Sequence, residues 1–80
     1  MKLRKLGSSF YKLETEHCSI WFSYETPIGF WYSGQTVCME NNWGPTTGKH
    51  LNFIDGGTVE AKAKRLRLTE FQKRLKKVLL

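Results

Sequence analysis

The segment Cys18-Ser-Ile-Trp-Phe-Ser-Tyr24 gives a clear signal of secondary structure, because its side chains alternate strictly between two faces of an extended chain. One face carries Cys18, Ile20, Phe22 and Tyr24. The other face carries Ser19, Trp21 and Ser23. A period of two residues is typical of a β-strand, so the segment predicts a strand.

The neighbouring segments extend this strand into a sheet. An apolar run at 28–32 ends at Ser33-Gly34, a pair typical of the two-residue loop of a tight hairpin. Residues 35–40 are then the returning strand, and residues 10–15 form another strand before Cys18. The first half of the chain therefore predicts a small antiparallel β-sheet of three to five strands.

The second half of the chain predicts helices. Residues 41–45, Asn-Asn-Trp-Gly-Pro, are typical of a turn, after which Thr46 or Thr47 would cap a short central helix that reaches Ile54. Asp55-Gly-Gly57 would end this helix, and a short strand is expected at 64–68.

An amphipathic basic helix is expected at the C-terminus, with Thr69-Glu-Phe-Gln72 as its capping box. Its apolar stripe consists of Phe71, Leu75, Val78 and Leu79. Its basic residues are Lys73, Arg74, Lys76 and Lys77. Together these elements predict an α+β fold, in which a sheet packs with a central helix and a C-terminal helix.

Length and composition favour one domain over residues 1–80, whose aromatic content of 14% supplies a dense core. The sequence has no apolar run of the roughly 18 residues that a membrane span needs, so we expect a soluble cytoplasmic protein without a membrane partner. Two cysteines, Cys18 and Cys38, are too few for a disulfide framework, and we expect reduced thiols.

The net charge of +6 is concentrated at the two ends of the chain. Residues 1–12 hold four basic side chains and no acid, and residues 62–80 hold eight basic side chains against Glu70 alone. Residues 13–61 are acidic, with six acids and one base, Lys49. If the termini lie near each other, the two ends form one basic surface.

Two patterns that resemble chemical sites fail on their spacing. The segment Gly44-Pro-Thr-Thr-Gly-Lys-His50 is one residue too short between its glycines for a phosphate-binding loop of nucleotide hydrolases, and histidine stands where serine or threonine is needed. A turn that enters a helix, or a helix terminus that binds one anion, explains it better. The possible zinc ligands His17, Cys18, Cys38 and His50 lack the paired spacing of structural zinc sites. We expect no metal, no cofactor and no catalytic residues, and hence no enzyme.

The aromatic residues leave two interpretations open. Trp21 and Trp31 alternate against their apolar neighbours, so they share the second face of the sheet, whereas Trp43 lies in the turn. Either helices cover that face, or an aromatic platform stays exposed for stacking of unpaired bases or for a protein partner.

The basic C-terminal segment is the strongest functional indication, because lysine and arginine on a surface helix neutralise phosphates. A solvated helix face is the simpler alternative. The expected nucleic-acid contacts are Arg65, Arg67, Lys73, Arg74, Lys76 and Lys77.

The sequence also resembles a family of small uncharacterised proteins of phages, prophages and some archaeal mobile elements. The likeness rests on Ser23-Tyr-Glu-Thr-Pro-Ile28, on Glu40-Asn-Asn-Trp-Gly-Pro-Thr-Thr-Gly-Lys-His-Leu-Asn52 and on the terminal helix, and would cover about residues 20–80. The resemblance implies a domain of unknown function in a host cytoplasm, with no catalytic residues to transfer. If its signature is a site for an anion or a partner, that site contains Trp43, Thr46, Thr47, Lys49, His50 and Asn52.

The sequence thus favours a non-enzymatic nucleic-acid-binding module, with DNA or RNA as its partner. The alternative is a phage effector that binds and inhibits a host protein, such as a nuclease or a defence complex. An open sheet edge is compatible with a monomer or a homodimer.

Overall fold

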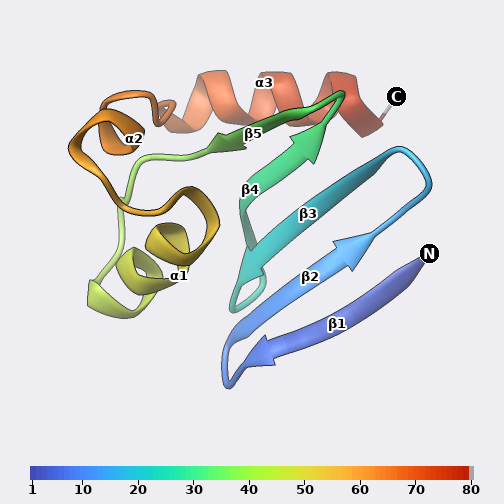
Figure 1. The fold of residues 1–80 in the computed structure, drawn as a ribbon, viewed down its shortest axis with the longest axis horizontal. Coiled ribbons are helices and arrows are strands. Elements are labelled where there is room, and N and C mark those ends of the chain that lie inside the picture. The colour runs from blue at the N-terminus through green and yellow to red at the C-terminus, as the bar shows by residue number, and fades with distance from the viewer. Residues whose placement is uncertain (80) are drawn as a thin grey trace.

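The structure, a computed structural model, describes residues 1–79 as a five-stranded antiparallel sheet with three helices (Figure 1). The strands are β1 (Lys2–Gly7), β2 (Phe10–Glu14), β3 (Cys18–Ser23), β4 (Thr26–Tyr32) and β5 (Gln35–Cys38). The helices are α1 (Pro45–Asp55), α2 (Val59–Ala63) and α3 (Leu68–Leu79). The predicted α+β class is confirmed. In residues 1–79, no helix is long and apolar enough to cross a membrane.

The sheet is a simple meander, with strands in the order β1-β2-β3-β4-β5. The predicted hairpin is confirmed: Tyr32 pairs with Gln35, and the two residues between them, Ser33 and Gly34, have φ angles of 52° and 79°. Positive φ at both loop positions is the geometry of a type I′ turn, which suits the twist of a hairpin.

A β-bulge at Ile28 divides β4 between the two faces of the sheet. Trp21 pairs with Gly29 and Phe22 pairs with Pro27, so Ile28 has no partner on β3. Ile28 and Phe30 consequently belong to different hydrophobic clusters although they are two residues apart.

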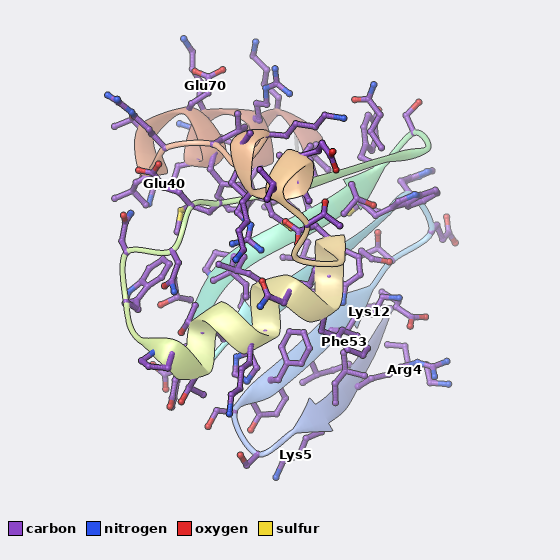
Figure 2. All side chains as sticks on the ribbon, turned by 60° about the vertical axis from the view of Figure 1, so that its left-hand side comes forward. Arg4, Lys5, Lys12, Glu40, Phe53 and Glu70 are labelled. Carbon is purple, nitrogen blue, oxygen red and sulfur yellow. The ribbon has the colours of Figure 1, made fainter. Side chains whose placement is uncertain are left out.

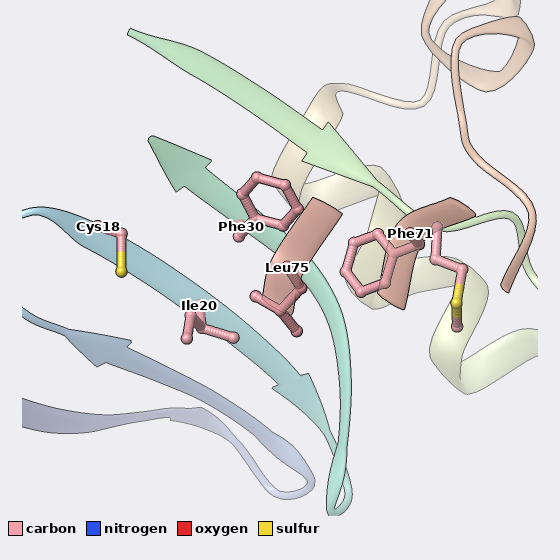
Figure 3. Close-up of a cluster of buried hydrophobic side chains, with 6 residues drawn as sticks. Cys18, Ile20, Phe30, Phe71 and Leu75 are labelled. Carbon is pink, nitrogen blue, oxygen red and sulfur yellow. The ribbon is translucent and has the colours of Figure 1, made fainter. Parts of the chain in front are cut away.

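The two clusters lie on opposite faces of the sheet. On one face, Phe71 and Leu75 of α3 pack with Ile20 and Phe30, and Figure 3 shows Leu75 next to both of these sheet residues. On the other face, Leu51 of α1 packs with Phe10 and Ile28. Their residues alternate along β5, where Val37 packs with the first cluster and Cys38 belongs to the second.

Helix α1 approaches the sheet closely at Gly29. A Cβ atom there would lie 3.3 Å from Cys38 Sγ and 3.3 Å from Ile54 Cδ1. The absence of a side chain at Gly29 is therefore what lets α1 lie against β4.

Both predicted helix starts are wrong. Helix α1 starts at Pro45 with Gly44 as its N-cap, and it has no side-chain cap because glycine has no side chain. Thr47 lies inside the first turn, with its hydroxyl 2.9 Å from that of Ser23. Helix α3 starts at Leu68, so Thr69 lies inside its first turn rather than at the cap. The predicted end of α1 holds, since Gly56 forms the left-handed C-cap with φ of 87°.

The predicted strand at 64–68 is a single bridge. Leu66 N–H donates to Cys38 O at 2.9 Å, and Glu40 N–H donates to Leu66 O at 2.8 Å. Helix α2 before it and α3 after it leave no room for a longer strand. The sequence interpretation missed α2 and β1, because α2 has five residues and all six residues of β1 are exposed.

Candidate nucleic-acid interface

Helix α3 is fixed on the sheet by its apolar side. Phe71 is fully buried, and its ring centroid lies 5.5 Å from that of Phe30. Leu75 is buried one turn later, and Val78 packs against the same cluster. This seating determines which side of α3 faces outward.

The outward side carries exposed cations, which we call the α3 basic surface: Lys73, Arg74, Lys76 and Lys77. Glu70 is the single acid of the helix, and its Oε1 lies 3.6 Å from Arg74 Nε, with both side chains half exposed. Such a solvent-exposed pair has little strength. The surface therefore keeps most of its positive charge, and Arg67 adds a further exposed cation at the start of α3.

Arg65 does not join this surface. Its side chain is 7% exposed, and Nε and Nη2 donate to the Asp55 carboxylate at 2.8 and 2.9 Å. Nη2 also lies 3.1 Å from Asn52 Oδ1. Burial alone would raise the pKa of Asp55, but hydrogen bonds from Arg65 and from Gly57 N–H hold it below its usual value. Arg65 thus ties α1 to the chain before α3, and its charge is already neutralised.

The basic N-terminal segment lies at the opposite edge of the sheet from α3. Strand β1 is four strands away from β5, roughly 19 Å at the usual strand spacing. Its charge is also partly compensated, since Glu14 Oε1 lies 2.9 Å from Arg4 Nε and 3.8 Å from Lys12 Nζ. Figure 2 shows Arg4, Lys5 and Lys12 on the strands at this edge. The two basic ends of the chain therefore form separate surfaces.

The signature segment divides into inward and outward residues. Inward, Ser23 Oγ lies 2.9 Å from Thr47 Oγ1 and 2.7 Å from His50 Nδ1. The His50 ring stacks on Phe10 with centroids 4.5 Å apart, and burial lowers the pKa of His50 below its usual 6.5. Thr47 and His50 therefore connect α1 to β2 and β3.

The remaining signature residues are exposed and do not converge on one point. Trp43 precedes α1, Thr46 and Lys49 lie on its outer side, and Asn52 is bonded to Arg65. Of the signature residues, Thr47 and His50 thus hold α1 against the sheet, and Asn52 contacts Arg65.

The contact between Ser23 and His50 has the distance of an activated nucleophile, which sequence spacing could not indicate. Ser23, however, is 3% exposed and shares its hydroxyl with Thr47. No carboxylate within residues 1–79 is hydrogen-bonded to His50. This arrangement satisfies buried polar groups rather than presenting a reactive hydroxyl.

The tryptophans lie as the alternation predicts, with Trp21 and Trp31 on the α1 face of the sheet. Trp21 is half-buried against the cluster that contains Leu51 of α1, whereas Trp31 is 42% exposed, so that face is only partly covered. Lys12 Nζ lies 5.1 Å from the Trp21 ring centroid, so a cation of the chain already occupies the open side of that ring.

Both cysteines are free and buried, on opposite faces of the sheet. Burial, and then the nearby Asp55 carboxylate, raises the pKa of Cys38 to about 12. Such a thiol is a poor nucleophile. The residues with described positions contain no group of three or more side chains that could hold a metal ion.

Residues 1–73 match a family of unknown function, DUF8033. The chain belongs to this family. The match to DUF8033 begins at residue 1 rather than near residue 20, so it includes the basic N-terminal strand, and it ends inside α3. Searches of curated proteins and of solved structures found no significant match.

Proposed function

We propose that the protein is a non-enzymatic nucleic-acid-binding module that contacts phosphates through the α3 basic surface. One observation carries this proposal: a helix whose apolar side is locked on the sheet presents four exposed cations with one weakly paired acid. Cations held at fixed positions release counterions from a nucleic acid, which favours binding. Arg67 belongs to the proposed interface, whereas Arg65 does not.

The resemblance to phage and prophage proteins supports a cellular setting for this proposed function. The protein would act in the cytoplasm of a host cell, on DNA or RNA of the host or of the mobile element. Neither a metal nor a cofactor takes part in this function.

A binding experiment with matched charge variants tests the proposal. Fluorescence anisotropy of labelled duplex DNA, single-stranded DNA and RNA would be measured against the wild-type protein and Lys73→Gln/Lys76→Gln/Lys77→Gln. Glutamine keeps a similar helix propensity, so the fold should persist. The matched control is Lys2→Gln/Lys5→Gln/Lys49→Gln, which removes the same charge from exposed positions away from α3.

We expect the α3 triple variant to lose most of the affinity and the control to retain it. An equal loss from both variants would mean that net charge alone drives binding, and the interface on α3 would be rejected. No binding by the wild-type protein at low salt would reject the function itself.

A protein partner is the second candidate, and the exposed apolar side chains of α1 favour it. Phe53 is 69% exposed, and Trp43 just before the helix is 46% exposed. Aromatic side chains of this kind are common anchors in protein interfaces. This candidate would be favoured if the wild-type protein bound a host protein but no nucleic acid, and if Phe53→Ala abolished binding to that host protein.

A further inference from the structure

A shallow hollow borders the α3 basic surface on the side of the sheet. Its volume is about 160 Å³. It is lined from the β4–β5 hairpin by Phe30, Tyr32, Gln35 and Val37, and from α3 by Arg74, Lys77 and Val78. Figure 1 shows the same arrangement, since the hairpin reaches along the C-terminal half of α3. The hollow therefore combines an apolar floor with two cations.

Tyr32 is the exposed ring of this hollow. The residue is 45% exposed, and it is the last residue of β4 before the type I′ turn. On the same face its strand neighbour is Cys18, which is buried in the α3 cluster. The turn and the sheet thus fix the backbone of Tyr32, and its flat apolar ring can stack on another ring.

Arg74 and Lys77 supply phosphate ligands beside the ring. They are three residues apart on α3, so they lie on neighbouring turns of one side of the helix. Glu70 lies near Arg74, and no acidic side chain within residues 1–79 lies within ion-pair distance of Lys77. The positive charge at Lys77 is consequently available to a ligand.

We propose that Tyr32, Arg74 and Lys77 form a subsite that takes one unpaired base and its flanking phosphate, so that the protein prefers single-stranded nucleic acid to duplex. This inference rests on the proposed function and specifies its substrate. Base stacking on an aromatic side chain together with backbone contact to cations is how proteins hold single strands. In a duplex the bases are stacked on each other, and their faces are out of reach of Tyr32.

A larger hollow of about 660 Å³ on the other side of β5 fits this ligand less well. Its lining includes Asp55 and Glu60 as well as Lys64, Arg65 and Arg74, and Arg65 is already paired with Asp55. Acidic groups repel phosphates, whereas the charged residues that line the smaller hollow, Arg74 and Lys77, are both cations, so the smaller hollow is the better site.

The test compares two adjacent exposed rings on opposite faces of the sheet. A labelled oligothymidylate, an oligouridylate and a duplex of the same length would be titrated with wild-type protein, Tyr32→Leu and Trp31→Ala. Tyr32→Leu keeps apolar volume in the hollow but removes the ring, and Trp31→Ala is the matched control at 42% exposure. Tyr32→Phe keeps the stacking ring and should rescue binding.

We expect wild-type protein to bind single strands more tightly than duplex. Tyr32→Leu should weaken single-strand binding by roughly 5- to 100-fold, the usual range for loss of one stacked base. It should leave duplex binding within about twofold, as should Trp31→Ala and Tyr32→Phe for every probe. The DNA and RNA arms distinguish the two sources of the single strand.

Unchanged single-strand affinity in Tyr32→Leu would overturn the subsite, as would an equal loss in Trp31→Ala. Salt-sensitive binding that still depends on Lys73, Lys76 and Lys77 would then leave the proposed function standing. Absence of binding by the wild-type protein would overturn both.

Discussion

The two faces of the sheet are built by different means. The α1 face combines apolar packing with polar connections, in which Ser23, Thr47 and His50 join strand to helix and Arg65 joins Asp55. The α3 face is joined to its helix by the apolar contacts around Phe71, and its cations point outward. Thr47 and His50 of α1 therefore hold the fold together, whereas the lysines of α3 stay exposed to solvent.

Truncation of the apolar side chain that holds α3 on the sheet should have the largest effect on the free energy of unfolding. Phe71 is fully buried, so Phe71→Ala should lower the free energy of unfolding by about 3–5 kcal/mol. Leu79→Ala on the same helix is the control, because Leu79 is exposed and should change stability by about 0.5 kcal/mol or less. Urea denaturation followed by circular dichroism gives both values. Similar small losses of stability in Phe71→Ala and Leu79→Ala would mean that α3 does not pack on the sheet.

Loss of the ion pair between Arg65 and Asp55 on the α1 face should have the next largest effect on the free energy of unfolding. Arg65→Gln leaves the Asp55 carboxylate, whose side chain is 13% exposed, without its partner, and should cost about 3 kcal/mol. Adding Asp55→Asn should recover part of this loss. The control is Arg67→Gln, which removes an exposed guanidinium two residues away.

The same two variants also test which of the two arginines contributes to nucleic-acid binding. In oligonucleotide titrations, Arg65→Gln should bind like the wild-type protein, whereas Arg67→Gln should bind more weakly. A folded Arg65→Gln protein that loses binding would show that the buried arginine contributes to the interface after all.

Protonation of His50 should have the smallest effect on the free energy of unfolding. Because burial lowers the pKa of His50, the unfolded chain takes up a proton at a higher pH than the folded chain does. Stability is therefore complete above about pH 6.5 and falls as the pH drops through the lowered pKa. Thermal denaturation from pH 7.5 to 5 should show this loss, and His50→Gln should flatten it.

The control for that experiment is His17→Gln, at an exposed position. It should keep the pH dependence of the wild-type protein. If the stability of His50→Gln depends on pH as steeply as that of the wild-type protein, the contact between His50 and Ser23 does not contribute to the pH dependence between pH 7.5 and 5.

The sequence predicts the elements whose signals are local. Alternation between Cys18 and Tyr24 defines β3, and Ser33-Gly34 defines the hairpin. The apolar stripe defines α3, although its predicted last member, Leu79, is exposed. Each of these signals lies within one strand, one turn or one helix, where the period of side chains is decisive.

The roles of several polar residues could not be predicted, because their partners are distant in the sequence. Thr47 resembles a cap, but its hydroxyl meets Ser23, which lies 24 positions earlier. Arg65 resembles a surface cation, but it meets Asp55, ten positions earlier. Tyr32 carries no local signal for the stacking role that we propose, which depends on the residues of α3 that line the same hollow.

The salt dependence of binding is the sharpest test of a phosphate-binding interface on α3. The logarithm of the binding constant of a single-stranded oligonucleotide would be plotted against the logarithm of salt concentration, from about 50 to 200 mM, for the wild-type protein and the two triple lysine variants. If Lys73, Lys76 and Lys77 each contact a phosphate, their loss should make the slope shallower by about 2.1, at 0.7 for each contact. The control variant should keep the wild-type slope. Equal slopes for all three proteins would contradict an interface on α3.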